Sequence, residues 1–235
     1  MNPPLGSNRQ LVLSYLALRK AVGIIGVMLP FGLAIGKSLA QGPGIEDSIS
    51  YYYYTDMRSL LVASLCAIGM FLVSTRGYDN RDKYAGWFAC VFAIGVAFCP
   101  TTRHENPSGL ERFIGWEHLL WAASLFGTLA YFSWFLFTET DPTKKPTPRK
   151  LVRNIVYRVC AVVIVVSILL DPVFTKGGLH PVASWPDAVF CLESLAVFAF
   201  GVSWLVKGEA ILKDQTVSNP APRASVSNNF ISGKR

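Results

Sequence analysis

Six long apolar runs constrain the fold of this chain more than any other feature of its sequence. A helix needs about 20 predominantly apolar residues to cross the hydrocarbon core of a bilayer, and shorter runs can cross when their flanks reach into the interface. Backbone groups inside lipid must be hydrogen-bonded within the chain, so such runs form helices. The sequence therefore predicts an all-α, polytopic transmembrane helix bundle. Its six transmembrane helices have approximate cores at residues 21–36, 60–75, 84–99, 118–137, 155–170 and 188–206.

Composition excludes an ordinary soluble domain. Hydrophobic residues make up 51% of the chain and charged residues only 16%, whereas about a quarter of the residues in a soluble domain are charged. The net charge of +7 does not indicate a nucleic-acid partner, because the basic residues fall between the apolar runs instead of forming a stripe. We expect membrane lipids as partners, one transmembrane domain over residues 1–213, and a disordered cytoplasmic tail over residues 214–235.

The distribution of Lys and Arg predicts the orientation of the bundle. Most of the 22 basic residues lie in the N-terminal segment, the second and fourth loops and the C-terminal tail. Cytoplasmic segments carry the excess of Lys and Arg in membrane proteins, so both termini are expected in the cytoplasm. The opposite, outer side holds the remaining basic residues, which are Lys37, Arg58, Arg103, Arg112 and Lys176.

Glu193 is an acidic residue inside the last apolar run. A carboxylate within the hydrocarbon costs about 2.5 kcal/mol or more unless it is protonated, hydrogen-bonded or turned into the protein. Ala196, Ser203 and Lys207 share its helical face, which predicts that Glu193 points into the bundle. Its leading candidate partner is Arg58, which has the opposite charge and belongs to the same side of the membrane.

Four consecutive tyrosines, residues 51–54, precede the second apolar run. The interpretation that we favour is an interfacial aromatic belt, in which the rings lie among headgroups and the hydroxyls stay hydrated. In the alternative interpretation, some of these hydroxyls line a headgroup or solute pocket together with Asp56 and Arg58. The candidate binding residues are therefore Tyr54, Asp56, Arg58, Glu117, His118 and Glu193.

His118 stands at the predicted outer entrance of the fourth helix, where a hydrogen-bonded interfacial histidine is the simplest interpretation. The chain has no HExxH motif and no repeated Cys or His spacing, so we expect no metal ion or other cofactor. The alternative is a zinc or acid–base site assembled from separate helices, as is usual in bundles. That site would combine His118 and Glu193 with either His180 or Asp56.

Small residues recur at four-residue spacing in three of the predicted helices. Such stripes let helix backbones approach closely in lipid. They predict a compact bundle, and the alternative is that one of them forms a homo-oligomer. The residues are Gly32 and Gly36 in the first helix, Ser59, Ala63 and Ala67 in the second, and Ala123 and Gly127 in the fourth.

Two stretches resemble a known group of proteins. Residues 48–58 with the following segment 69–78, and Glu193 with residues 200–209, are similar to recurring patterns in uncharacterised bacterial inner-membrane proteins with six helices. The resemblance implies a multi-pass protein of the bacterial cytoplasmic membrane and draws attention to Asp56, Arg58, His118 and Glu193. Such proteins have no established activity, so the resemblance implies none here.

These patterns leave three hypotheses for function. The leading one is a non-enzymatic integral membrane protein whose outward-facing polar pocket binds a lipid headgroup or small solute, or that supports an assembly. The first alternative is a membrane-embedded hydrolase acting on lipid, with metal or acid–base chemistry at His118 and Glu193. The second is a small proton-coupled transporter in which Glu193 takes up and releases a proton.

Overall fold

The computed structural model describes residues 5–74, 80–102, 108–140, 143, 146–176 and 187–213. Within these residues every regular element is helical, which confirms the predicted all-α class. A 3-10 helix, η1 (Ile49–Tyr54), precedes α2, and a π-helical turn, η2 (Phe132–Leu136), extends α4. The predicted disordered tail, residues 214–235, lies outside the described residues. The α-helices are α1 (Leu5–Gln41), α2 (Arg58–Ser74), α3 (Asn80–Phe98), α4 (Gly109–Tyr131), α5 (Pro148–Lys176) and α6 (Ala188–Lys207).

Four stretches of helix in the described chain are long and apolar enough to cross a membrane. They are Leu13–Gln41 in α1, Phe113–Leu136 across α4 and η2, Pro148–Phe174 in α5, and Ala188–Lys207, which is α6. Such helices are typical of a multi-pass membrane protein. The helix α2 is equally apolar but shorter, and α3 begins with charged residues.

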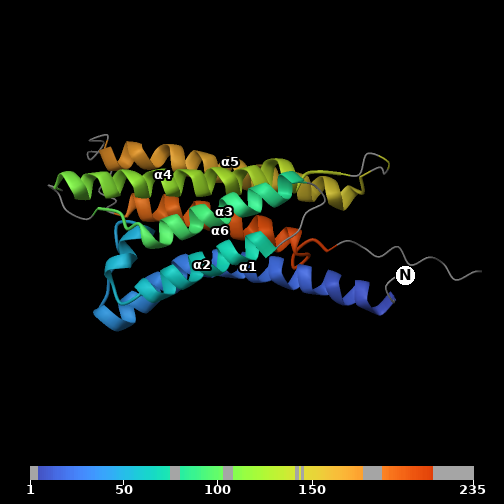
Figure 1. The fold of residues 1–235 in the computed structure, drawn as a ribbon, viewed down its shortest axis with the longest axis horizontal. Helices are drawn as coiled ribbons and strands as arrows, with labels where there is room; N and C mark the ends of the chain where they lie inside the picture. Colours follow the sequence, from blue (N-terminus) through green and yellow to red (C-terminus); the bar gives the residue numbers. More distant parts are fainter. Residues whose placement is uncertain are drawn as a thin grey trace, which may run out of the picture.

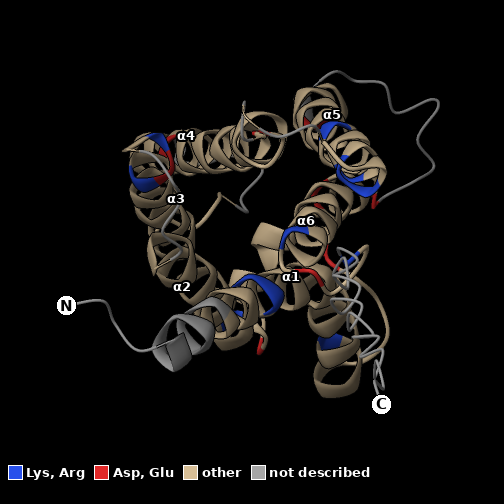
Figure 2. Cartoon of the chain, turned by 90° about the vertical axis from the view of Figure 1, so that its right-hand side faces the viewer, with Lys and Arg blue, Asp and Glu red and all other residues tan. Residues whose placement is uncertain are grey.

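The six helices form a closed ring in chain order. Each helix packs against its two neighbours in the sequence, and α6 closes the ring against α1. Successive helices run in opposite directions along the long axis of the molecule (Figure 1). Figure 2, which looks along that axis, shows the helices arranged around a common centre. The helix η1 lies at the end of the bundle opposite the N-terminus (Figure 1).

Glycines bring α1 and α6 into close contact. A Cβ atom at Gly201 would lie 2.6 Å from the backbone nitrogen of Val27, and one at Gly23 would lie 2.9 Å from the carbonyl oxygen of Gly201. Neither position has space for a side chain, so the two backbones approach as they do at small-residue interfaces in membranes.

The glycines that the sequence pattern singled out, Gly32, Gly36 and Gly127, do not lie in this contact between α1 and α6. A Cβ at Gly32 would touch Leu60, and one at Gly36 would collide with Met57, so this stripe packs α1 against the start of α2. It therefore serves a contact within the chain. Gly127 on α4 faces open space, with no atom within 4 Å of the position of its Cβ.

The helix boundaries correct one prediction about His118. The helix α4 begins at Gly109, so His118 lies about 13 Å inside it at 1.5 Å per residue, and the predicted place at the helix entrance is wrong. The helix begins before the predicted run, and the additional turns carry exposed apolar side chains, including Leu110 and Phe113. The helix α1 continues through Pro30 without a break.

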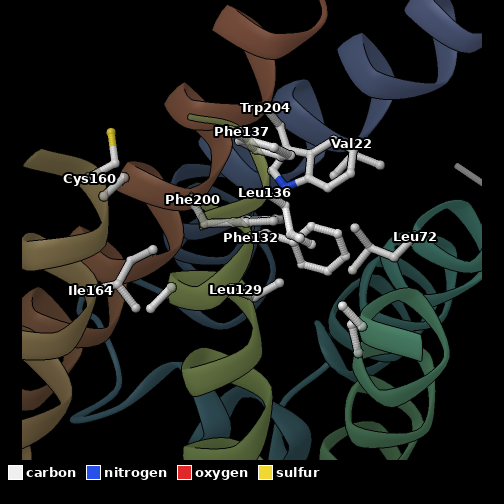
Figure 3. Close-up of a cluster of buried hydrophobic side chains, with 14 of the residues drawn as sticks. Val22, Leu72, Leu129, Phe132, Leu136, Phe137, Cys160, Ile164, Phe200 and Trp204 are labelled. Carbon is white, nitrogen blue, oxygen red and sulfur yellow. The ribbon is translucent and has the colours of Figure 1, made fainter. Parts of the chain in front are cut away.

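A core of large side chains fills the ring toward the end away from η1. Trp204 of α6 is 1% exposed, and its ring lies 5.1 Å from that of Phe137 and 5.7 Å from that of Phe132. Figure 3 shows these rings gathered with Phe200 and with Val22 of α1. The remaining length of the ring, between this core and η1, contains a cavity.

Candidate functional site

The cavity has an internal volume of about 70 Å³, or about 760 Å³ when the open space at its mouth is included. Its wall is formed by α1, α2, α3, α4, α6 and η1. Most of the wall is aliphatic or aromatic. Polar side chains come from Ser50, Tyr53, His118 and Glu193. The apolar lining residues are Leu29, Ile49, Leu61, Leu65, Ile68, Val96, Pro100, Ala122, Leu125, Phe126, Leu129, Val197 and Phe200.

The cavity is polar at one end only. Its floor is formed by Ile68, Leu129 and Phe200, which belong to the hydrophobic core. From His118 to Leu129, α4 rises by about 16 Å at 1.5 Å per residue, which gives the length of the wall. The polar side chains all lie at the end that η1 closes, and we call this end the roof.

The helix η1 is held firmly in the roof. Tyr52 is fully buried, at 0% exposure, and its ring packs 5.9 Å from that of Phe190 on α6. Its hydroxyl accepts a hydrogen bond of 3.3 Å from the backbone N–H of Glu46. Burial raises the pKa of the Tyr52 phenol, although the hydrogen bond from Glu46 acts against that increase.

The favoured interpretation of the tyrosine cluster as an interfacial belt is therefore wrong for Tyr52 and Tyr53. The first is buried, and the second lines the cavity. The reason is that a 3-10 helix turns through about 120° per residue, so four successive tyrosines cannot all face the same environment. Tyr54 is exposed, and its hydroxyl donates to the carbonyl of Thr101 at 2.7 Å.

Glu193 points into the bundle, as its helical face predicted, and reaches η1. Its carboxyl oxygen Oε2 accepts a hydrogen bond of 2.6 Å from the backbone N–H of Ile49, and Ser48 Oγ donates to the same group at 3.0 Å. The first N–H groups of a helix have no partners within the helix, so a carboxyl oxygen satisfies a group that would otherwise be buried unbonded. Glu193 thus ties α6 to η1.

The predicted pairing of Arg58 with Glu193 is wrong. Arg58 donates a hydrogen bond to the hydroxyl of Tyr53, and its guanidinium carbon lies 4.0 Å from the centre of the Tyr53 ring. The chain entering α2 turns through η1 first, so backbone and serine groups of the turn reach Glu193 in place of the arginine.

His118 is 7% exposed and connects three elements. Its Nδ1 lies 2.5 Å from the carbonyl oxygen of Cys99, at the end of α3. A carbonyl oxygen only accepts, so Nδ1 carries the proton. In the neutral ring Nε2 is then an acceptor, and it lies 2.9 Å from Ser50 Oγ on η1. Ser50 therefore donates its hydroxyl proton to His118.

Four of the remaining candidates do not contribute side chains to the cavity wall, and a fifth cannot be placed. Asp56, Tyr54 and Arg58 are exposed at the start of α2 or just before it, and Glu117 is half-buried on α4 without reaching the cavity. His180 lies outside the described residues. Two residues that the sequence did not single out, Ser48 and Ser50, complete the roof with Tyr53, which agrees with the alternative interpretation of the tyrosine run as part of a pocket. A serine before a short helix is a capping signal that could have indicated Ser48.

No set of three His, Cys, Asp or Glu side chains among the described residues is placed to hold a metal ion. Comparison with protein-family models, with curated proteins and with solved structures found no match to this chain. Function therefore has to be inferred from the cavity and its roof.

Proposed function

We propose that this protein binds an amphiphilic molecule of the membrane, with an alkyl chain in the cavity and a polar head at the roof. One observation carries the proposal: the cavity is apolar along its length and polar at one end, where Ser50, Tyr53 and His118 meet.

The chemistry of the wall favours a lipid-like ligand over a small polar solute. Burying an alkyl chain contributes about 25 cal/mol per Å² of apolar area, whereas a polar solute would lose its water to a wall that offers few hydrogen bonds. The roof supplies the oxygen of Ser50 as an acceptor and the hydroxyl of Tyr53, which suit a hydroxyl, ester or protonated carboxyl head. This proposal narrows the ligand of the predicted outward-facing pocket to a lipid-like molecule.

The membrane placement that goes with this function has six spans. The helices α2 and α3 occupy the same ring as the four long spans, and an even number of spans puts both termini on one side. The excess of Lys and Arg at that end assigns it to the cytoplasm, and the resemblance described above suggests a bacterial cytoplasmic membrane. The roof then lies toward the outer face.

Reporter fusions after residue 213 test this placement. A fluorescent protein that matures only in the cytoplasm is expected to be bright there, and a phosphatase that folds only outside is expected to be inactive. The opposite pair of results would invert the orientation and would place the roof toward the cytoplasm.

Ligand binding is tested with a matched pair of neighbouring alanines on α4. Ala122 lines the cavity, whereas the neighbouring Ala123 is exposed on the surface of the bundle. Ala122→Phe fills the cavity, and Ala123→Phe adds the same volume outside it. We expect a dansyl-labelled fatty acid to bind the parent and Ala123→Phe saturably in mild detergent, and to bind Ala122→Phe at least tenfold more weakly.

Two results would contradict the proposal. One is the absence of saturable binding to the parent protein. The other is equal binding by Ala122→Phe and Ala123→Phe, which would place the fatty acid on the lipid-facing surface of the bundle.

A further inference from the structure

We infer that Ser50 is a nucleophile and His118 its general base, so that the protein cleaves a carboxylic ester of the amphiphile bound in its cavity. This inference rests on the proposed function, because the cavity has to bring the ester carbonyl to the roof. The central observation is the distance of 2.9 Å between Ser50 Oγ and His118 Nε2. A serine and a base within hydrogen-bond reach, with the base oriented by a third group, are the signature of an activated nucleophile.

The third group is the carbonyl of Cys99. It lies 2.5 Å from Nδ1 of His118 and so fixes both the tautomer and the orientation of the imidazole. The lone pair of Nε2 is thereby directed at the Ser50 hydroxyl. A carboxylate often fills this orienting position, but the orientation itself requires only an acceptor at Nδ1.

Capping at the start of η1 does not occupy the hydroxyl of Ser50. At the start of η1 the capping oxygen belongs to Ser48, which accepts from the backbone N–H of Ser50 at 3.0 Å and donates to Glu193 at 3.0 Å. Ser48 and Glu193 thus hold η1 in place. The hydroxyl of Ser50 is left to face His118 at the wall of the cavity.

Tyr53 is placed to stabilise the oxyanion of the reaction. Side chains three positions apart eclipse one another in a 3-10 helix, and Ser50 and Tyr53 of η1 both line the cavity. The Tyr53 oxygen accepts a hydrogen bond from Arg58, so that bond does not use the proton of the Tyr53 hydroxyl. The guanidinium of Arg58 makes the Tyr53 hydroxyl a stronger hydrogen-bond donor, because its positive charge stabilises negative charge on the phenolic oxygen.

These positions define a balanced reaction. Ser50 Oγ forms a bond to the ester carbonyl carbon while its proton moves to His118 Nε2, and Tyr53 donates to the resulting oxyanion. The bond from the carbonyl carbon to the alkoxy oxygen then breaks, and the alcohol leaves with the proton from Nε2. Water, deprotonated by the same nitrogen, attacks the acyl-serine and releases the carboxylic acid and the free hydroxyl of Ser50.

The test uses the full-length protein in mild detergent with two probes: an alkyl fluorophosphonate and the p-nitrophenyl ester of a medium-chain fatty acid. Intact mass followed by peptide mapping should find one phosphonyl adduct per chain, on Ser50, and the ester should release nitrophenol. Ser50→Ala should lose both reactions. His118→Gln should slow both by at least about 100-fold, the usual minimum for a general base.

The matched control is Ser59→Ala, which removes an exposed serine at the start of α2 and should leave both reactions unchanged. Tyr53→Phe should slow ester cleavage by about 100-fold, as the loss of one oxyanion donor does. Peptide mapping locates the phosphonyl adduct in the parent protein itself. The test therefore remains decisive even if Ser50→Ala does not fold.

The outcomes separate this inference from the proposed function. Saturable fatty-acid binding with no adduct on Ser50, and with ester cleavage no faster than in Ser50→Ala, would overturn the inference while leaving the binding function in place. Such a result would make the contact between Ser50 and His118 a structural hydrogen bond. The absence of saturable fatty-acid binding to the parent protein would instead overturn the proposed function.

Discussion

The carboxyl oxygen Oε2 of Glu193 lies 2.6 Å from the backbone nitrogen of Ile49. This hydrogen bond joins the second turn of the ring's last helix to the 3-10 helix η1. Through Ser48 the same carboxyl holds the turn whose next serine, Ser50, faces His118. The acidic residue inside the membrane-spanning helix therefore positions the roof of the cavity.

A double-mutant cycle tests this anchoring. Glu193→Ala leaves the N–H of Ile49 and the hydroxyl of Ser48 without an acceptor, so we expect it to cost about 1–3 kcal/mol of unfolding free energy. Ser48→Ala should cost about 1 kcal/mol as the loss of a helix cap. Both residues belong to one hydrogen-bond network. The losses of unfolding free energy in the two single variants should therefore sum to more than the loss in the double variant. Thermal unfolding in detergent measures the three values, and strict additivity would contradict a shared network.

The contact between α1 and α6 predicts a contrast between two glycines. Gly201→Ala places a Cβ 2.6 Å from the backbone nitrogen of Val27, so the helices must separate and the protein should lose about 1–3 kcal/mol, as in overpacked cores. Gly127→Ala meets no atom within 4 Å and should be neutral or stabilising by up to about 1 kcal/mol, because alanine favours a helix. Unfolding temperatures of the two variants check the contrast, and equal destabilisation would contradict it.

Trp204 should be the most sensitive of the tryptophans on the described helices. Trp204→Leu removes a ring that is 1% exposed and that packs on Phe137 and Phe132, so a loss of about 3 kcal/mol or more is expected from the resulting cavity. Trp87→Leu removes a ring that is 54% exposed and should cost less than about 1 kcal/mol. Denaturant unfolding in detergent distinguishes them, and similar losses would place Trp204 outside the core.

The buried phenol of Tyr52 predicts a dependence of stability on alkaline pH. Its pKa is raised in the folded protein by burial, so folding favours the neutral phenol. In the unfolded chain the Tyr52 phenol ionises at about pH 10. The stability that its neutral form contributes is therefore fully present below that pH and is lost as the pH rises through the higher pKa of the folded protein. Tyr52→Phe should reduce the fall in unfolding temperature above pH 10, whereas Tyr54→Phe, at an exposed position, should leave it unchanged.

The fold was largely accessible from the sequence because its signals are local. Apolar length predicted helices, and four of the predicted cores coincide, to within one residue, with helices long enough to cross a bilayer. The helical spacing of Glu193 with Ala196 and Ser203 predicted which side faces inward, and both small residues are fully buried. The starts of α1 and α4 were not predicted, since helices continue past the membrane-like part of the pattern.

The site depended on contacts that no local pattern encodes. Ser48 meets Glu193, Ser50 meets His118, and His118 meets Cys99, in each case between different elements of the ring. Charge alone suggested Arg58 for Glu193, and composition alone suggested an interfacial belt for the tyrosines. The sequence by itself determined that the chain forms apolar helices with Glu193 on an inward face, because length and periodicity act within one segment. Only the tertiary structure decided that η1 lies across the ring and supplies the partners of both Glu193 and His118, because those hydrogen bonds form where separate helices converge.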